Sequence, residues 1–154
     1  MAIRHWHLDS GAIRINNFPE NEIQIGVIAC VMASETSIAI DSTGVKAWTS
    51  RHYVPPEMVK HAKQGILIAR ASTPSATDAV VNVELYDDTA ADVVASIQYA
   101  GVGGVKSTTL DQDTVKQLAG HNVHIRINVV TASATAGASQ GFQMAEFLVI
   151  LGIS

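Results

Sequence analysis

The residues whose types and spacing come nearest to a metal site are His5, His7 and Asp9, close to the N-terminus. In an extended segment alternate side chains share one face, so two imidazoles and a carboxylate would point the same way. Such a set can hold Zn²⁺ or another transition ion. No motif fixes a fourth ligand, and Trp6 and Leu8 on the opposite face indicate a docking segment. We therefore interpret it as the polar face of an N-terminal arm and predict no metal and no cofactor.

A glycine-rich stretch from Ala100 to Ser107 superficially matches a phosphate-binding loop. A P-loop needs glycine immediately before its lysine, so that the backbone can wrap the phosphate, and a helix after it. Here Val105 precedes Lys106, and the residues that follow are typical of a strand. The stretch is predicted to be a turn between two strands.

Two carboxylate pairs, Asp87-Asp88 and Asp111-x-Asp113, could bind Ca²⁺ in a loop. Neither carries the central glycine and terminal glutamate of an EF-hand. We interpret all four as solvated acids of turns.

Candidate catalytic groups are few. His121 and His124 lie at strand ends without an obvious acid or nucleophile, which predicts surface residues. The residues of a catalytic triad can come from distant parts of the chain, so the sequence alone does not exclude a Ser-His-Asp triad. No G-x-S-x-G elbow is present, and Ser139-Gln140-Gly141 does not replace it. Cys30, inside an apolar run, is predicted to be a small buried side chain, and the chain is predicted not to be an enzyme.

Trp48 and Tyr53 flank the pair Arg51-His52, and together they could form a small ligand-binding platform. Such residues more often anchor a loop onto the core, which is our interpretation here. Aromatic residues make up only 5% of the chain, which weakens a sugar-binding interpretation without excluding it.

Alternation of apolar and polar residues is the strongest structural signal. The clearest case is one set of four apolar residues alternating with three polar ones: Val123, Ile125, Ile127 and Val129 with His124, Arg126 and Asn128. This period is typical of a half-buried β-strand, and it recurs upstream between turn clusters. We predict an all-β fold, an antiparallel β-sandwich or jelly roll of about 8–9 strands. Residues 1–20 are predicted to form the N-terminal arm and 21–154 a single domain.

One short helix is predicted at about 56–64. Pro55-Pro56 suits a first turn, because proline lacks an N–H that would be unpaired there anyway. Glu57 lies near the positive end of the helix dipole, and Gly65 is predicted to end the helix.

The C-terminal strand, from Phe142 to Ile153, is apolar on both faces. A strand of this kind must be covered on both faces, and in a short chain the second cover could be another subunit. We therefore predict a self-association surface formed by Phe147, Leu148, Val149, Ile150 and Leu151.

Composition narrows the classes of function. Charged residues make up 16% of the chain, which is low, and hydrophobic residues 47%, which favours a chain that hides surface in an assembly. The net charge is −4 and no Lys/Arg cluster exists, so nucleic-acid binding is not expected. The sequence contains no membrane-spanning stretch and no signal peptide, which predicts a soluble protein made in the cytoplasm.

The arm from Met1 to Pro19 and the Ala/Thr/Ser/Gly/Val-rich strands between Ile66 and Ile153 resemble the capsid decoration (cement) proteins of tailed bacteriophages. The resemblance lies in the residue composition and strand pattern over most of the chain. It implies a homo-oligomer, often a trimer, seated on a capsid lattice in the virion and clamping neighbouring capsid proteins, without catalysis or cofactor. Under it, the arm residues Ile3, Trp6 and Leu8 would contact the lattice.

Two alternatives remain open from the sequence. One is a carbohydrate- or small-ligand-binding β-sandwich module. The other is a metal-dependent enzyme on a jelly-roll scaffold, which would need a ligand set that the sequence does not identify.

Overall fold

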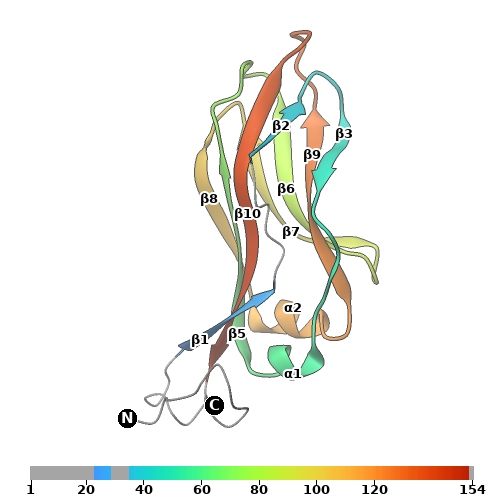
Figure 1. Cartoon of the computed structure of the whole chain (residues 1–154), viewed down its shortest axis with the longest axis vertical. Helices are drawn as coiled ribbons and strands as arrows, with labels where there is room; N and C mark the ends of the chain where they lie inside the picture. The colour runs from blue at the N-terminus through green and yellow to red at the C-terminus, as the bar shows by residue number, and fades with distance from the viewer. Residues whose placement is uncertain (1–22, 29–34, 153–154) are drawn as a thin grey trace.

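In a computed structural model, residues 23–28 and 35–152 are described, and they form two facing β-sheets with two short helices (Figure 1). The predicted arm, 1–20, with its candidate residues Ile3, His5, Trp6, His7, Leu8 and Asp9, lies outside the described residues. Cys30 also lies outside them. The elements run β1 (Ile23–Ile28), β2 (Thr36–Ala39), β3 (Gly44–Trp48), β4 (His52–Tyr53), α1 (Pro56–Val59), β5 (Ala62–Ala71), β6 (Val80–Asp87), β7 (Asp92–Ala100), β8 (Gly104–Leu110), α2 (Gln112–Gln117), β9 (Asn122–Thr131) and β10 (Ser139–Gly152).

The strand order is that of a jelly roll. In the first sheet, sheet A, β1 and β2 both pair with β10, followed by β5 and β8. In the second sheet, sheet B, β3 and β4 both pair with β9, followed by β6 and β7. Every pairing is antiparallel. With β1/β2 and β3/β4 each counted as one interrupted strand, the chain crosses between the sheets in the double Greek-key pattern, so the predicted fold class is confirmed.

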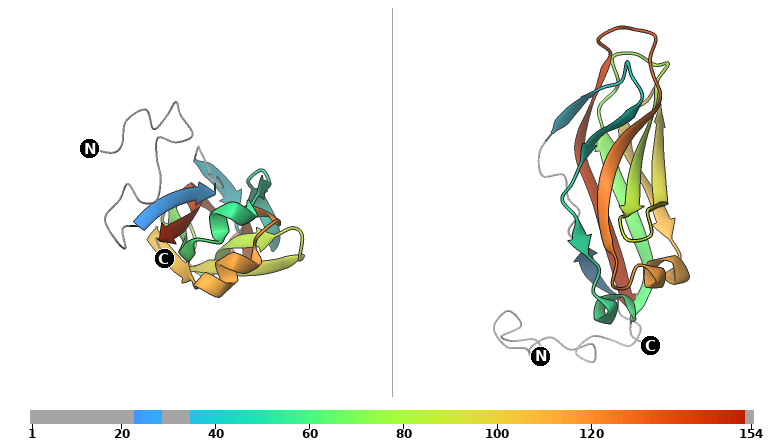
Figure 2. Two further views of the ribbon diagram at one scale, coloured as in Figure 1. Left: turned by 90° about the horizontal axis from the view of Figure 1, so that it is seen from below. Right: turned by 90° about the vertical axis from the view of Figure 1, so that its right-hand side faces the viewer.

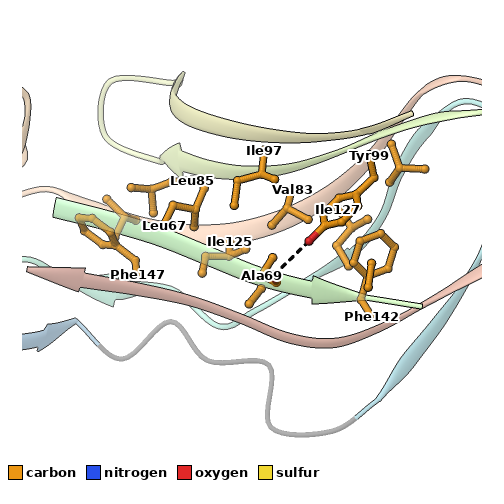
Figure 3. Packing of buried hydrophobic residues seen from close by; sticks show 14 of the residues in the cluster. Leu67, Ala69, Val83, Leu85, Ile97, Tyr99, Ile125, Ile127, Phe142 and Phe147 are labelled. Carbon is orange, nitrogen blue, oxygen red and sulfur yellow. Dashed lines mark hydrogen bonds between the residues drawn. The ribbon is translucent and has the colours of Figure 1, made fainter. Parts of the chain in front are cut away.

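The core lies between the two sheets, and the period-two alternation of the strands builds it (Figure 3). Val81, Val83 and Leu85 of β6 are buried, while their polar neighbours face outward. The ring of Tyr99 packs edge-on against Phe142, with ring centres 5.7 Å apart. These inward side chains come from both sheets, so the packing holds the sheets together.

Strand β10 shows which of its apolar residues belong to this core. Phe147 and Val149 are fully buried, and Leu151 packs against the core beyond a register shift at Ile150/Leu151. The prediction that Phe147 and Val149 belong to a self-association surface is therefore wrong, because they fill the space between the sheets. Leu151 is only partly buried, and its place in such a surface stays a prediction. Leu148 and Ile150 are half-buried on the opposite face of sheet A.

The helix is shorter than predicted. α1 ends at Val59, a turn follows at residues 60–61, and the rest of the predicted helix begins β5, a strand that includes Gly65. A Cβ on Gly65 would lie 2.9 Å from both Phe147 Cε1 and Val115 Cγ2, so this glycine provides close packing and does not end a helix. Sequence spacing did not separate these two uses of glycine.

A second helix, α2, closes the same end of the sandwich as α1 (Figure 2). Its cap is Asp111, whose carboxylate accepts the Thr114 backbone N–H at 2.7 Å. This hydrogen bond lowers the pKa of Asp111, as expected for an N-cap aspartate. Asp111 is thus a capping residue. No helix in the described part of the chain is long and apolar enough to cross a membrane.

Candidate functional site

The densest group of interacting polar side chains lies on the outer face of sheet B. Strand register places Glu84 of β6 opposite Arg126 of β9, and Tyr86 opposite His124. The alternation that buries Ile125 and Ile127 makes their neighbours face outward, so the sequence pattern already places these four side chains on one face. Directly opposed residues in antiparallel strands are close enough to pair.

Arg126 is held by two partners. Its Nε donates to Glu84 Oε1 at 2.8 Å, and the Glu84 side chain is only 8% exposed. Its guanidinium carbon lies 4.0 Å from the centre of the Tyr86 ring, a cation–π arrangement. An arginine fixed by a carboxylate and a ring keeps its remaining N–H groups in a defined orientation.

The turn after β6 supplies two more carboxylates. Asp88 contacts His124 Nδ1 at 2.8 Å and Arg51 Nε at 3.2 Å. Asp87 is buried, contacts His121 Nδ1 at 2.6 Å and accepts two backbone N–H groups of its own turn. The interpretation of Asp87-Asp88 as solvated turn acids is therefore wrong.

The expectation that His121 and His124 lack an acid is wrong for the same reason. Their partners are 34 and 36 residues away along the chain, a distance that no local motif reveals. Both pairs lie where the start of β9 meets the β6–β7 turn.

Trp48 borders this polar group because of a β-bulge. The register of β3 on β9 shifts between Val45 and Ala47, so Val45 faces Asn128 and Trp48 faces Arg126. Strict alternation would have placed Val45 and Trp48 on opposite faces, and the extra residue brings both to the outside. Trp48 is 69% exposed, so the interpretation of this residue as an anchor onto the core is wrong.

Together these elements line a groove of about 440 Å³, which we call the Trp48 groove; it is lined by Val45, Trp48, Thr49, Ser50, Arg51, His124 and Arg126. Tyr53, the other half of the predicted platform, is 57% exposed but is not part of this lining. The platform therefore exists in part, with Trp48 and Arg51 in it.

The other sequence candidates have structural roles. The glycine-rich stretch is the predicted turn, between β7 and β8, and Lys106 Nζ donates to the Gln98 carbonyl at 2.9 Å. Gln140 is buried and donates to the carbonyls of Ser72 and Val102, which ties two loops to the start of β10.

Chemically, the arrangement is suited to binding. Both carboxylates of the face, Glu84 and Asp88, are paired with cationic or imidazole groups. Ser50 Oγ lies 3.3 Å from His52 Nε2, but the two Asp–His pairs involve other histidines. Within the described ranges, no three His, Cys, Asp or Glu side chains gather in a way that could hold a metal ion.

Comparison with known proteins gives no relative in sequence, since neither a family model nor a curated protein matches. Among solved structures, the chain is similar to the VP2 subviral particle of infectious bursal disease virus, with 11% identity and a TM-score of 0.48. That similarity covers 85% of this chain and 32% of the viral one, so the chain spans about a third of its length.

Two other similar structures are binding modules of about this size. One is the CBM2 module of the evolved Dit of Lactobacillus casei BL23 phage J-1, with 8% identity, coverage of 86% and 99%, and a TM-score of 0.45. The other is a carbohydrate-binding module of Cellvibrio mixtus lichenase 5A in complex with cellotriose, with 9% identity, coverage of 84% and 100%, and a TM-score of 0.38. Similarities this weak do not decide between roles, which must be argued from the residues of this chain.

Proposed function

We propose that this chain is a non-enzymatic structural subunit of a virion, a capsid decoration protein that self-associates and clamps neighbouring capsid proteins. The observation that carries the proposal is an aliphatic patch on the outer face of sheet A, formed by Ile66, Ile68, Leu148 and Ile150. Leu148 lies directly opposite Ile66 across the β5–β10 pair, which joins the two halves of the patch. Ile68 lies opposite Glu146 and Ile150 opposite Gln64, so polar side chains border the patch.

An outer face of an antiparallel sheet is normally polar where it meets water. The middle of β6 and β9 follows that rule with Asn, Glu, His and Arg side chains on the outer face of sheet B. The middle of β5 and β10 instead carries the four half-buried aliphatic side chains of the patch. Covering the aliphatic patch would contribute about 25 cal/mol for each Å² of apolar surface buried, offset by the entropy of association. The same patch on each subunit supports a homo-oligomer, for which we favour a trimer.

The test is the solution mass by light scattering of the wild type and of Leu148→Asp and Ile150→Asp. We expect the wild type to be an oligomer and both variants to be monomers, because a charge on the patch would be desolvated in the interface. Because the Asp variants could fail to fold, the milder variants Leu148→Thr and Ile150→Thr are measured beside them. They should also shift the mass toward the monomer. Val130→Asp, at an exposed position of β9, is the matched control and should keep the wild-type mass. An oligomer of unchanged mass in all the patch variants would overturn the assignment.

The partner-contacting role of the arm is a separate proposal. Deleting residues 1–10 removes Ile3, Trp6 and Leu8 and should weaken binding to a capsid lattice while the melting temperature of the domain stays the same. Cosedimentation with capsids measures the first quantity and calorimetry the second. Full retention of lattice binding by the deletion would contradict the proposed role of the arm.

A further inference from the structure

The Trp48 groove lies on the sheet opposite to the aliphatic patch, and its most unusual member is an indole that is 69% exposed at the end of β3. A large aromatic side chain left in water loses the free energy that burial would provide. Tryptophan with one face free and polar groups around it is typical of recognition surfaces. The bulge at Val45/Ala47 holds this side chain on the outer face beside Arg126.

The polar lining of the groove is ordered before any ligand arrives. Arg126 is fixed by Glu84 and Tyr86, and His124 by Asp88 at 2.8 Å. Arg126 uses Nε for Glu84, and its two Nη groups carry four further N–H donors. His124 uses Nδ1, which leaves Nε2 on the other side of the ring. Preorganised donors and acceptors reduce the entropy lost on binding.

The balance of charges in the groove favours a neutral ligand. Two guanidinium groups, Arg51 and Arg126, are matched by two carboxylates, Asp88 and Glu84, so the local charge from these groups is zero. A phosphate- or sulfate-bearing polymer needs an excess of positive charge. A flat apolar ring beside balanced donors and acceptors instead matches a neutral sugar, which offers an apolar C–H face and hydroxyl groups at its rim.

We propose that the Trp48 groove binds neutral oligosaccharides, with Trp48 stacking on a sugar ring and with Arg51, Arg126 and His124 hydrogen-bonding its hydroxyls. The groove volume of about 440 Å³ lies within the range of small-ligand sites. We assign the groove a binding role, in which both nearby carboxylates, Asp88 and Glu84, hold the donors in place through ion pairs. This inference does not depend on the assembly role of sheet A.

The experiment is titration calorimetry of the full chain with four neutral hexasaccharides, linked β-1,4-glucose, β-1,3-glucose, β-1,4-mannose and α-1,4-glucose, and with a heparin-derived hexasaccharide as charged comparator. We expect at least one neutral sugar to bind and the heparin fragment to bind more weakly. Trp48→Ala should weaken binding of the neutral sugar by about tenfold or more. Trp48→Phe should weaken this binding by less, because phenylalanine keeps an aromatic ring.

Tyr53→Ala removes an exposed aromatic residue outside the groove and is the matched control, with affinity expected to be unchanged. Both positions are exposed, so neither variant should unfold the protein. Three results would overturn the proposal: no neutral sugar binds up to millimolar concentration, Trp48→Ala binds as tightly as wild type, or the heparin fragment binds more tightly than every neutral sugar. None of these results would change the mass expected for the sheet A variants.

Discussion

At the scale of single residues, the hydroxyl of Tyr99 connects strands of different sheets. Its oxygen lies 3.0 Å from the carbonyl of Ala69 in β5 (Figure 3). The same oxygen lies 2.9 Å from the carbonyl of Gly104 at the start of β8, so the two carbonyls share its one proton. Burial of the side chain raises the pKa of Tyr99, because the phenolate would be desolvated and could not donate. The contribution of this group to stability is thus complete below about pH 10 and is lost as the pH rises through the raised pKa.

Tyr99→Phe should lower the free energy of unfolding by about 1–2 kcal/mol at neutral pH, because the buried carbonyl of Ala69 and the part-buried carbonyl of Gly104 lose a donor. Above about pH 10 the difference from wild type should shrink, since phenylalanine does not ionise. Urea unfolding at both pH values measures this, with the exposed Tyr53→Phe as control. An equal difference at neutral and alkaline pH would show that the proton of Tyr99 does not contribute.

At the scale of elements, the turn between β7 and β8 depends on glycine for two reasons. Gly101 has φ +68°, and a Cβ there would collide with the carbonyl oxygen of Thr77 in the neighbouring loop. Gly137, in the loop before β10, has φ +78° but open space around it. The two positions separate the cost of backbone conformation from that of close packing.

Gly137→Ala should lower the free energy of unfolding by about 1–2 kcal/mol, the cost of a left-handed conformation for a residue with a side chain. Gly101→Ala should cost about 1–3 kcal/mol more, because the loop carrying Thr77 must also move. Equilibrium denaturation of the two variants measures the difference. Equal losses would mean that the loop adapts without cost.

The same scale shows what the sequence could predict. Alternation fixes which side chains of β9 face outward, so the prediction for His124 and Arg126 is confirmed, and the same period in β6 turns Glu84 and Tyr86 outward. Their pairing was not predictable, because Arg126 and Glu84 are 42 residues apart and meet only through the sheet register. The bulge that turns Trp48 outward leaves no sequence signal either, since it adds one residue within an ordinary strand pattern.

At the scale of the whole molecule, the two outer faces differ in chemistry, and the two proposals divide between them. Sheet A presents aliphatic side chains at its centre and sheet B a paired polar network with one exposed indole. A ligand and a neighbouring subunit would thus occupy opposite sides of the sandwich. We expect saturating oligosaccharide to leave the oligomer mass unchanged, measured by light scattering with and without sugar. Dissociation of the oligomer by sugar would mean that the ligand and the neighbouring subunit bind the same face.

The position of β10 between β1/β2 and β5 also affects how the protein folds during its synthesis. This strand is synthesised after every strand it pairs with, and its partners in β1 and β2 precede it by about a hundred residues or more. Contacts so distant along the chain form slowly, so sheet A closes only after translation has passed β10. Until then the inner edge of β5 stays unpaired, and a stalled or truncated chain would present it to any passing strand.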